Sequence, residues 1–120
     1  MSETEWQSST QQAGDALEQA LATADPARAL ADLATAGRAV DAAIQEAMAA
    51  AVLAGTSMRR VAEIAGIAPN SVPPRLARSA PLAPYVAAGT ITADSIAVAR
   101  HDAATGRRPL IFTPRRKDTP

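Results

Sequence analysis

The side chains with the most distinctive chemistry and spacing lie between residues 57 and 79. They include Arg59, Arg60, Pro69, Asn70, Ser71, Arg75 and Arg78. An Asn amide can pair with N6 and N7 of one adenine, and Arg guanidinium groups bind guanine edges or phosphate oxygens. Residues of these types are able to contact phosphates and bases.

No comparable set predicts catalysis or metal binding. The chain contains no Cys, and its only His, His101, is followed by Asp102. Neighbouring residues on a helix do not face each other, so this pair does not indicate an acid–base couple. We interpret His101 as a surface residue near a helix C-terminus. With no phosphate-binding Gly loop or paired carboxylates either, we expect no enzyme activity, metal or other cofactor.

The elements that position these residues are expected to be helices. Ala accounts for 31 of the 120 residues, and the aromatic side chains are limited to Trp6, Tyr85 and Phe112. Ala favours helix but adds little core volume, and β-branched and aromatic residues are too few for a sheet. The composition predicts an all-α protein with a thin core and a long N-terminal helix.

The first half of the chain predicts two helices. Residues 1–9 are polar and lack periodicity, so we expect a disordered tail. A first helix is predicted from Thr10 to Thr23. The pair Asp25-Pro26 then provides an N-cap and a first-turn Pro for a helix that reaches Ala54 and ends at Gly55.

A stripe of apolar and small residues follows this long helix with alternating spacings of three and four, which is a heptad pattern. We predict that residues 10–55 form an acidic dimerisation region through this stripe. The alternative is packing within the chain, against the first helix and the C-terminal helices. The stripe consists of Leu30, Leu33, Gly37, Val40, Ile44, Ala47 and Ala51.

Residues 57–79 resemble a helix-turn-helix DNA-binding unit of small bacterial proteins. The resemblance rests on Val61 and Ala62 inside a first helix, Gly66 at the turn, and Ile67 plugging that turn. The inner face of a second helix is then supplied by Val72 and Leu76.

The resemblance implies that the second helix lies in the major groove while the first crosses the backbone. It places Pro69, Asn70 and Ser71 at base edges and Arg59 and Arg60 at phosphates. Bases or phosphates are within reach of Arg75 and Arg78. The alternatives are helix capping for Asn70 and Ser71 and a solvated surface for the arginines.

Two consecutive prolines, Pro73 and Pro74, depart from the helix-turn-helix pattern. Each removes a backbone donor and restricts the residue before it. We therefore expect the second helix to begin late, near Pro73, with Asn70 or Ser71 as its cap, and to be short. Base-specific reading is affected more than DNA contact itself, and a unit that serves only as a scaffold is the alternative.

The rest of the chain is predicted to form a helix and an arm. A helix from Ala93 to Thr105, capped by Thr92 and stopped by Gly106, completes a domain of residues 56–106. Residues 107–120 form a basic C-terminal arm that either contacts DNA or is a soluble tail. Its candidate contacts are Arg115, Arg116 and Lys117.

The net charge of zero divides unevenly along the chain. Residues 1–57 carry eight acids and two bases, a net of −6, whereas residues 58–120 carry ten bases and four acids, a net of +6. The basic half is suited to a phosphate backbone. The acidic N-terminus and the lack of a long apolar run predict a cytoplasmic protein without a membrane span.

The sequence as a whole thus predicts a dimeric bacterial protein that binds duplex DNA. Transcription regulation and maintenance of a plasmid or phage both fit such a protein. The alternative is a helical adaptor that binds a protein partner through its acidic half and whose helix-turn-helix no longer binds DNA.

Overall fold

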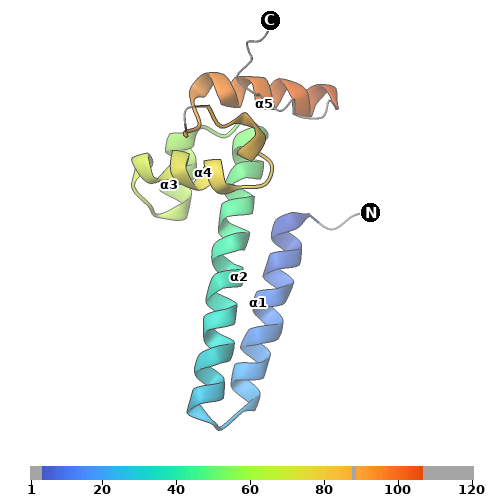
Figure 1. Cartoon of the computed structure of the whole chain (residues 1–120), viewed down its shortest axis with the longest axis vertical. Coiled ribbons are helices and arrows are strands. Elements are labelled where there is room, and N and C mark those ends of the chain that lie inside the picture. The colour runs from blue at the N-terminus through green and yellow to red at the C-terminus, as the bar shows by residue number, and fades with distance from the viewer. Residues whose placement is uncertain (1–3, 88, 107–120) are drawn as a thin grey trace, which may run out of the picture. The chain divides into compact units, whose positions relative to one another are not determined.

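The structure, a computed structural model, describes residues 4–87 and 89–106. It shows an all-α protein, as predicted (Figure 1). Among the described residues the only β-type pairing is an isolated bridge between Ala87 and Thr90. The helices are α1 (Glu5–Ala22), α2 (Pro26–Leu53), α3 (Met58–Ala65), α4 (Val72–Arg78) and α5 (Ala93–Thr105), with 3₁₀ turns at Pro69–Ser71 and Ala83–Tyr85.

The chain divides into two compact units, Met1–Ala47 and Met48–Pro120. The division falls inside α2, so the first contains α1 and most of α2, and the second contains the end of α2 and all later elements. We call them the N-terminal and C-terminal units.

The first helix begins earlier than predicted. Residues 5–9 were expected to be disordered, but they form the start of α1. The reason is a capping box: the Gln7 amide N–H donates to Thr4 Oγ1 and the Thr4 N–H donates to Gln7 Oε1, at 3.3 and 2.8 Å. These reciprocal bonds satisfy backbone donors that have no partner within the helix. They extend the start of α1 to Glu5, so that Trp6 is part of the helix.

The connection between α1 and α2 follows the prediction. The Asp25 carboxylate accepts a hydrogen bond from the Ala27 N–H at 3.1 Å, as an N-cap does, and Pro26 occupies the first helical position. At the other end α2 stops within one residue of the predicted boundary, and Gly55 follows it with φ of 115°.

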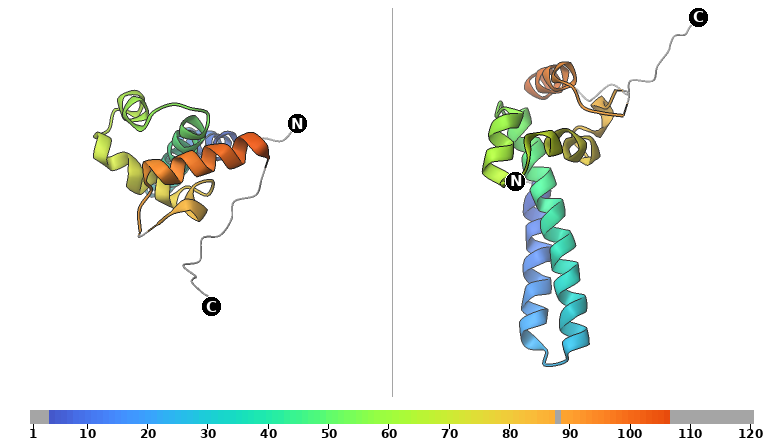
Figure 2. Two further views of the ribbon diagram at one scale, coloured as in Figure 1. Left: turned by 90° about the horizontal axis from the view of Figure 1, so that it is seen from above. Right: turned by 90° about the vertical axis from the view of Figure 1, so that its left-hand side faces the viewer.

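The N-terminal unit is a helical hairpin with a very small core. Figures 1 and 2 show α1 alongside the first part of α2. The two helices are also joined by a hydrogen bond from the Ser9 hydroxyl to the Glu46 carboxylate at 2.8 Å. Alanines permit close packing but bury only one methyl group each. The buried side chains of this unit are Ala13, Ala16, Ala36 and Ala39.

The predicted stripe of α2 does not form this core. Leu30 is 69% exposed and Leu33 is 50% exposed, and Val40 and Ile44 are each about 40% exposed. Leu30 and Leu33 therefore make little contact with the first helix, whereas Val40 and Ile44 border a groove that α1 residues also line. At its far end Ala51 packs against the core of the C-terminal unit, as the alternative of packing within the chain predicts for this end of the stripe.

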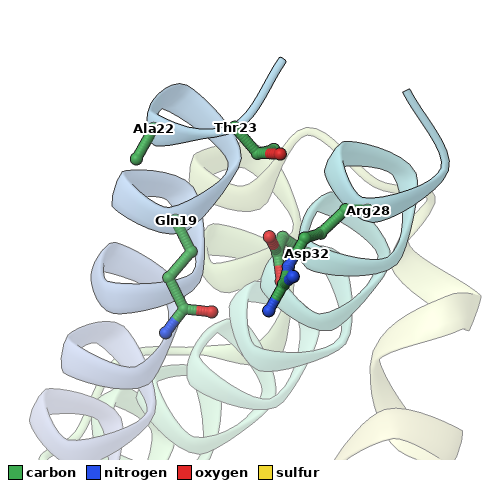
Figure 3. Close-up of a pocket in the computed structure, with 5 residues that line it drawn as sticks. All are labelled: Gln19, Ala22, Thr23, Arg28 and Asp32. Carbon is green, nitrogen blue, oxygen red and sulfur yellow. The ribbon is translucent and has the colours of Figure 1, made fainter. Parts of the chain in front are cut away.

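One side of the hairpin is polar. An open pocket of about 320 Å³ near the helix connection is lined by Gln19 and Thr23 of the α1 end and by Arg28 and Asp32 of α2 (Figure 3). The Ser9–Glu46 bond also involves polar groups of both helices.

The C-terminal unit has a continuous apolar core. Its most deeply buried side chains include Val72 and Leu76 of α4, which are fully inaccessible. The core joins the end of α2 to α3, α4, the segment after α4, and α5. Its members are Met48, Ala49, Val52, Val61, Ala62, Val72, Leu76, Leu82, Tyr85, Ile91, Ile96 and Ala99.

Two polar contacts attach α5 to this core. The Arg100 guanidinium donates to the Val52 carbonyl at 2.8 Å and to the Thr56 carbonyl at 3.1 Å, beside the C-terminus of α2. The Tyr85 hydroxyl donates to the Asp102 carboxylate at 2.7 Å. Asp102 is buried although the adjacent His101 is exposed, so these two side chains do point apart as predicted.

Among the described residues, no helix combines the length and apolar character that crossing a membrane requires.

Candidate nucleic-acid interface

The first helix of the candidate site, α3, contains Val61 and Ala62 and ends at the predicted turn residue, Gly66. The Ser57 hydroxyl accepts a hydrogen bond from the Arg60 N–H at 3.1 Å and caps its N-terminus. Val61 and Ala62 are buried against the core, which turns Arg59 outward. The helix thus presents arginines at its solvent-facing start.

A left-handed residue forms the turn after α3. Gly66 has φ of 73° and ψ of 32°, and its N–H donates to the Ala62 carbonyl at 2.9 Å. The next residue, Ile67, also donates to Ala62 and is half-buried against the core, so it fills the space beneath the turn. These contacts hold the predicted turn in place.

The conformation of Gly66 predicts a specific cost for Gly66→Ala. A Cβ added there would meet no atom within 4 Å, so the penalty comes from the left-handed backbone alone. We expect the free energy of unfolding to fall by about 1–2 kcal/mol, measured by urea denaturation. Asn tolerates this conformation better. Gly66→Asn should therefore cost less, and an equal or larger cost for Asn would contradict this explanation.

The second element of the unit begins late, as the double proline predicts. Residues 69–71 form a 3₁₀ turn, and α4 follows at Val72 with Pro73 and Pro74 in its first turn. Their missing N–H groups cost little there because first-turn donors have no partner within the helix. The element is therefore a short α-helix preceded by a 3₁₀ turn.

The two prolines also determine whether the polar residues before them can cap α4. Ser71 stands at the N-cap position, but its side chain makes no capping hydrogen bond. An N-cap side chain accepts from the second or third helical N–H, and here those positions are Pro73 and Pro74. The prediction that Ser71 takes the N-cap position is therefore correct, but side-chain capping by Ser71 is wrong.

The outward residues of this element fall on two short rows. Asn70, Pro74 and Arg78 are spaced by four residues and are all exposed, opposite the buried Val72 and Leu76. A second row consists of Ser71 and Arg75, which are half-buried, and Pro69 is exposed before both rows. The predicted site residues of this element thus share one outer side.

Three arginines of the site have no side-chain partner among the residues that the structure describes. Within residues 4–87 and 89–106, no hydrogen bond or ion pair involves the side chain of Arg59, Arg75 or Arg78. Arg60 instead pairs with Glu63 at 3.1 Å, with both side chains more than half exposed. Exposed ion pairs of this kind contribute little free energy. Arg60 can therefore exchange Glu63 for another anionic partner.

Sequence reasoning missed the two residues that attach α5. Arg100 has both of its contacts at the C-terminal end of α2 and is not part of the arginine set. Burial and the nearby Asp102 carboxylate raise the pKa of Tyr85 to about 12, which keeps its hydroxyl protonated. The predicted contacts Arg115, Arg116 and Lys117 lie outside the described residues.

Comparison of this chain with models of known protein families, with curated proteins and with solved structures finds no match. Within the described part of the chain, no three His, Asp or Glu side chains are grouped closely enough to hold a metal ion.

Proposed function

We propose that this protein binds duplex DNA through α3, the Gly66 turn and α4. The observation that carries the proposal is the pairing of a rigid, core-anchored turn with exposed arginines that have no partner among the described residues. Such cations favour anionic partners, because phosphate replaces only water and counterions around them.

The prolines determine which groups near the start of α4 can contact the DNA backbone. A helix N-terminus ordinarily offers free N–H groups to a phosphate. Here Val72 donates its N–H to the Pro69 carbonyl, and Pro73 and Pro74 have none. Phosphate contacts therefore come from Arg59, Arg60, Arg75 and Arg78 rather than from the helix end, and Asn70 and Ser71 remain available to base edges.

The acting form we propose is a homodimer that regulates transcription or maintains a plasmid or phage in a bacterial cytoplasm. Support for the dimer comes from the exposed stripe of α2, because large apolar side chains in a heptad pattern are normally covered. Paired units can read two half-sites of one operator, which is how helix-turn-helix dimers gain affinity.

The direct test is titration of the protein into a labelled duplex of random sequence, followed by fluorescence anisotropy at several salt concentrations. We expect binding whose logarithmic affinity falls linearly with logarithmic salt, by about 0.9 per phosphate contact. Failure to bind at low salt, or an affinity that does not change with salt concentration, would contradict the proposal.

A second candidate function is favoured by the same exposed stripe. A helical adaptor would bind a protein partner through this apolar surface, and its helix-turn-helix would not bind DNA. It predicts no duplex binding at any salt concentration, so the titration separates the two functions.

A further inference from the structure

The N-terminal hairpin carries large apolar side chains on both helices, on one face. We propose that this face binds a second copy of the chain, so that α1 and α2 of the two copies form an antiparallel four-helix bundle. The inference deepens the homodimer of the proposed function, on which it rests. We define the apolar face by Trp6, Leu17 and Leu21 of α1 and Leu30, Leu33, Gly37, Val40 and Ile44 of α2.

The two helices contribute to the same face because their apolar rows border one groove. This groove, about 300 Å³, is lined from α1 by Trp6, Thr10 and Ala13 and from α2 by Val40, Ala43, Ile44 and Ala47. Leu17 and Leu21 continue the α1 row at four-residue spacing, and the stripe continues the α2 row. An α2-only coiled coil would leave the α1 row exposed.

No charged residue belongs to the apolar face, whereas the opposite side carries Arg28, Asp32 and the Ser9–Glu46 bond. A hairpin that is apolar on one side and polar on the other has the pattern of half a helical bundle. The face carries no charge that would attract an oppositely charged protein. An identical face is complementary to it, because both are apolar.

The core of the hairpin buries little apolar surface, because its buried side chains among the described residues are four alanines. Leu21, by contrast, is 87% exposed. With α1 18 residues long, the face spans about 27 by 20 Å, so its flat area is roughly 500 Å². This area is of the same order as the approximately 800 Å² per partner of a standard interface.

Gly37 provides an independent indication that another backbone approaches. It lies in the middle of α2, and a Cβ added there would meet nothing within 4 Å. Gly is less favourable than Ala inside a helix, so a monomer would be more stable with Ala at this position. A helix of a second copy that crosses close to this position would explain why residue 37 is Gly.

The spacing of the face along α2 is nearly symmetrical about Gly37. Leu30 and Ile44 each lie seven residues from Gly37, and Leu33 and Val40 lie four and three residues from it. Two α2 helices that cross antiparallel at Gly37 therefore place Leu30 of each copy opposite Ile44 of the other.

The two-fold axis that relates the two α2 helices also sets α1 of each copy antiparallel to α1 of the other. Leu17 and Leu21, which are 44% and 87% exposed, are then covered at this contact.

Sedimentation equilibrium without DNA tests this interface, so its result is separate from that of DNA binding. We expect the 12.3 kDa chain to sediment with twice that mass and Val40→Asp to sediment as a monomer. The control Ala31→Asp adds the same charge to an exposed position of α2 outside the face and should stay dimeric. A monomeric wild type, a dimeric Val40→Asp variant or a monomeric Ala31→Asp variant would overturn the proposal.

Gly37→Ala supplies a variant that cannot lose dimerisation by failing to fold. The added methyl group favours helix in the monomer but obstructs the crossing, so we expect the dimer dissociation constant to rise about tenfold or more. Trp6, the only Trp, reports the same equilibrium, because its fluorescence should shift to shorter wavelength as concentration rises. An unchanged or tighter dimer in Gly37→Ala, or emission independent of concentration, would overturn the antiparallel bundle.

Discussion

Arg100→Ala is expected to lower the free energy of unfolding of the C-terminal unit by about 2–4 kcal/mol. The guanidinium donates to the carbonyl of Val52, in the last turn of α2, and to that of Thr56, just beyond the helix. The Val52 carbonyl also accepts from the Gly55 N–H at 3.1 Å, whereas the bonds from Arg100 connect this end of α2 to α5. Its positive charge also opposes the negative end of the helix dipole. Ala would remove both hydrogen bonds and the charge together.

The geometry of this contact makes Arg100→Lys an informative comparison. An ammonium group keeps the charge but cannot place two donors in the fixed fork of a guanidinium, so the loss should be intermediate. Arg78→Ala removes an exposed Arg with no described partner and should change stability by less than about 0.5 kcal/mol. Urea denaturation followed by helical circular dichroism gives all three values. Equal effects of Arg100→Ala and Arg78→Ala would contradict the role of Arg100.

Tyr85→Phe is expected to destabilise the same unit by about 1–3 kcal/mol. The change removes the hydroxyl that donates to the buried Asp102 carboxylate at 2.7 Å. The remaining carboxylate is 7% exposed and would keep only part of its solvation. A double-mutant cycle with Asp102→Ala measures the coupling between the two side chains, and a coupling near zero would contradict this contact.

The raised pKa of Tyr85 adds a pH dependence to this prediction. Burial and Asp102 raise that pKa from 10.0 to about 12, so the folded state holds the phenolic proton more tightly than the unfolded state. The resulting stabilisation is complete below pH 10 and is lost as pH rises towards 12. Urea denaturation across this range should show a steeper loss for wild type than for Tyr85→Phe, and parallel curves would contradict the assignment.

Local signals in the sequence predicted most helix boundaries. Asp25-Pro26, Ser57, Gly66 and Gly106 each act through bonds to residues a few positions away, so their effect can be inferred from neighbours alone. The start of α1 had an equally local signal, because Thr4 and Gln7 have the spacing of a capping box.

The packing of the hairpin was not predictable in the same way. Hydrophobicity ranks Leu30 and Leu33 above Ala36 and Ala39, yet the alanines are buried and the leucines are exposed. Close approach of α1 requires small side chains on the contact side, and periodicity alone does not say which stripe meets the neighbouring helix. Leu30 and Leu33 are left exposed and available to the second copy that we propose.

The contacts of α5 were missed because they join residues far apart in sequence. Arg100 meets carbonyls 48 and 44 residues away, and Tyr85 meets Asp102 across 17 residues. Such pairs have no spacing rule. For the candidate site, the sequence indicated the outward arginines and the late start of α4, but not that Pro73 and Pro74 would prevent capping by Ser71.

The central claim, that the α3–α4 unit binds duplex DNA through its unpaired arginines, is tested most directly by a matched pair of double variants. Arg75→Ala/Arg78→Ala removes two arginines of the site, and Arg28→Ala/Arg38→Ala removes two from the hairpin, so both change the net charge equally. The quantity to measure is the salt dependence of affinity for a random duplex.

We expect the site variant to bind roughly 10- to 100-fold more weakly at low salt, with a salt slope smaller in magnitude by about 2. The hairpin variant should bind like wild type. Equal affinities and slopes for the two variants would contradict the claim.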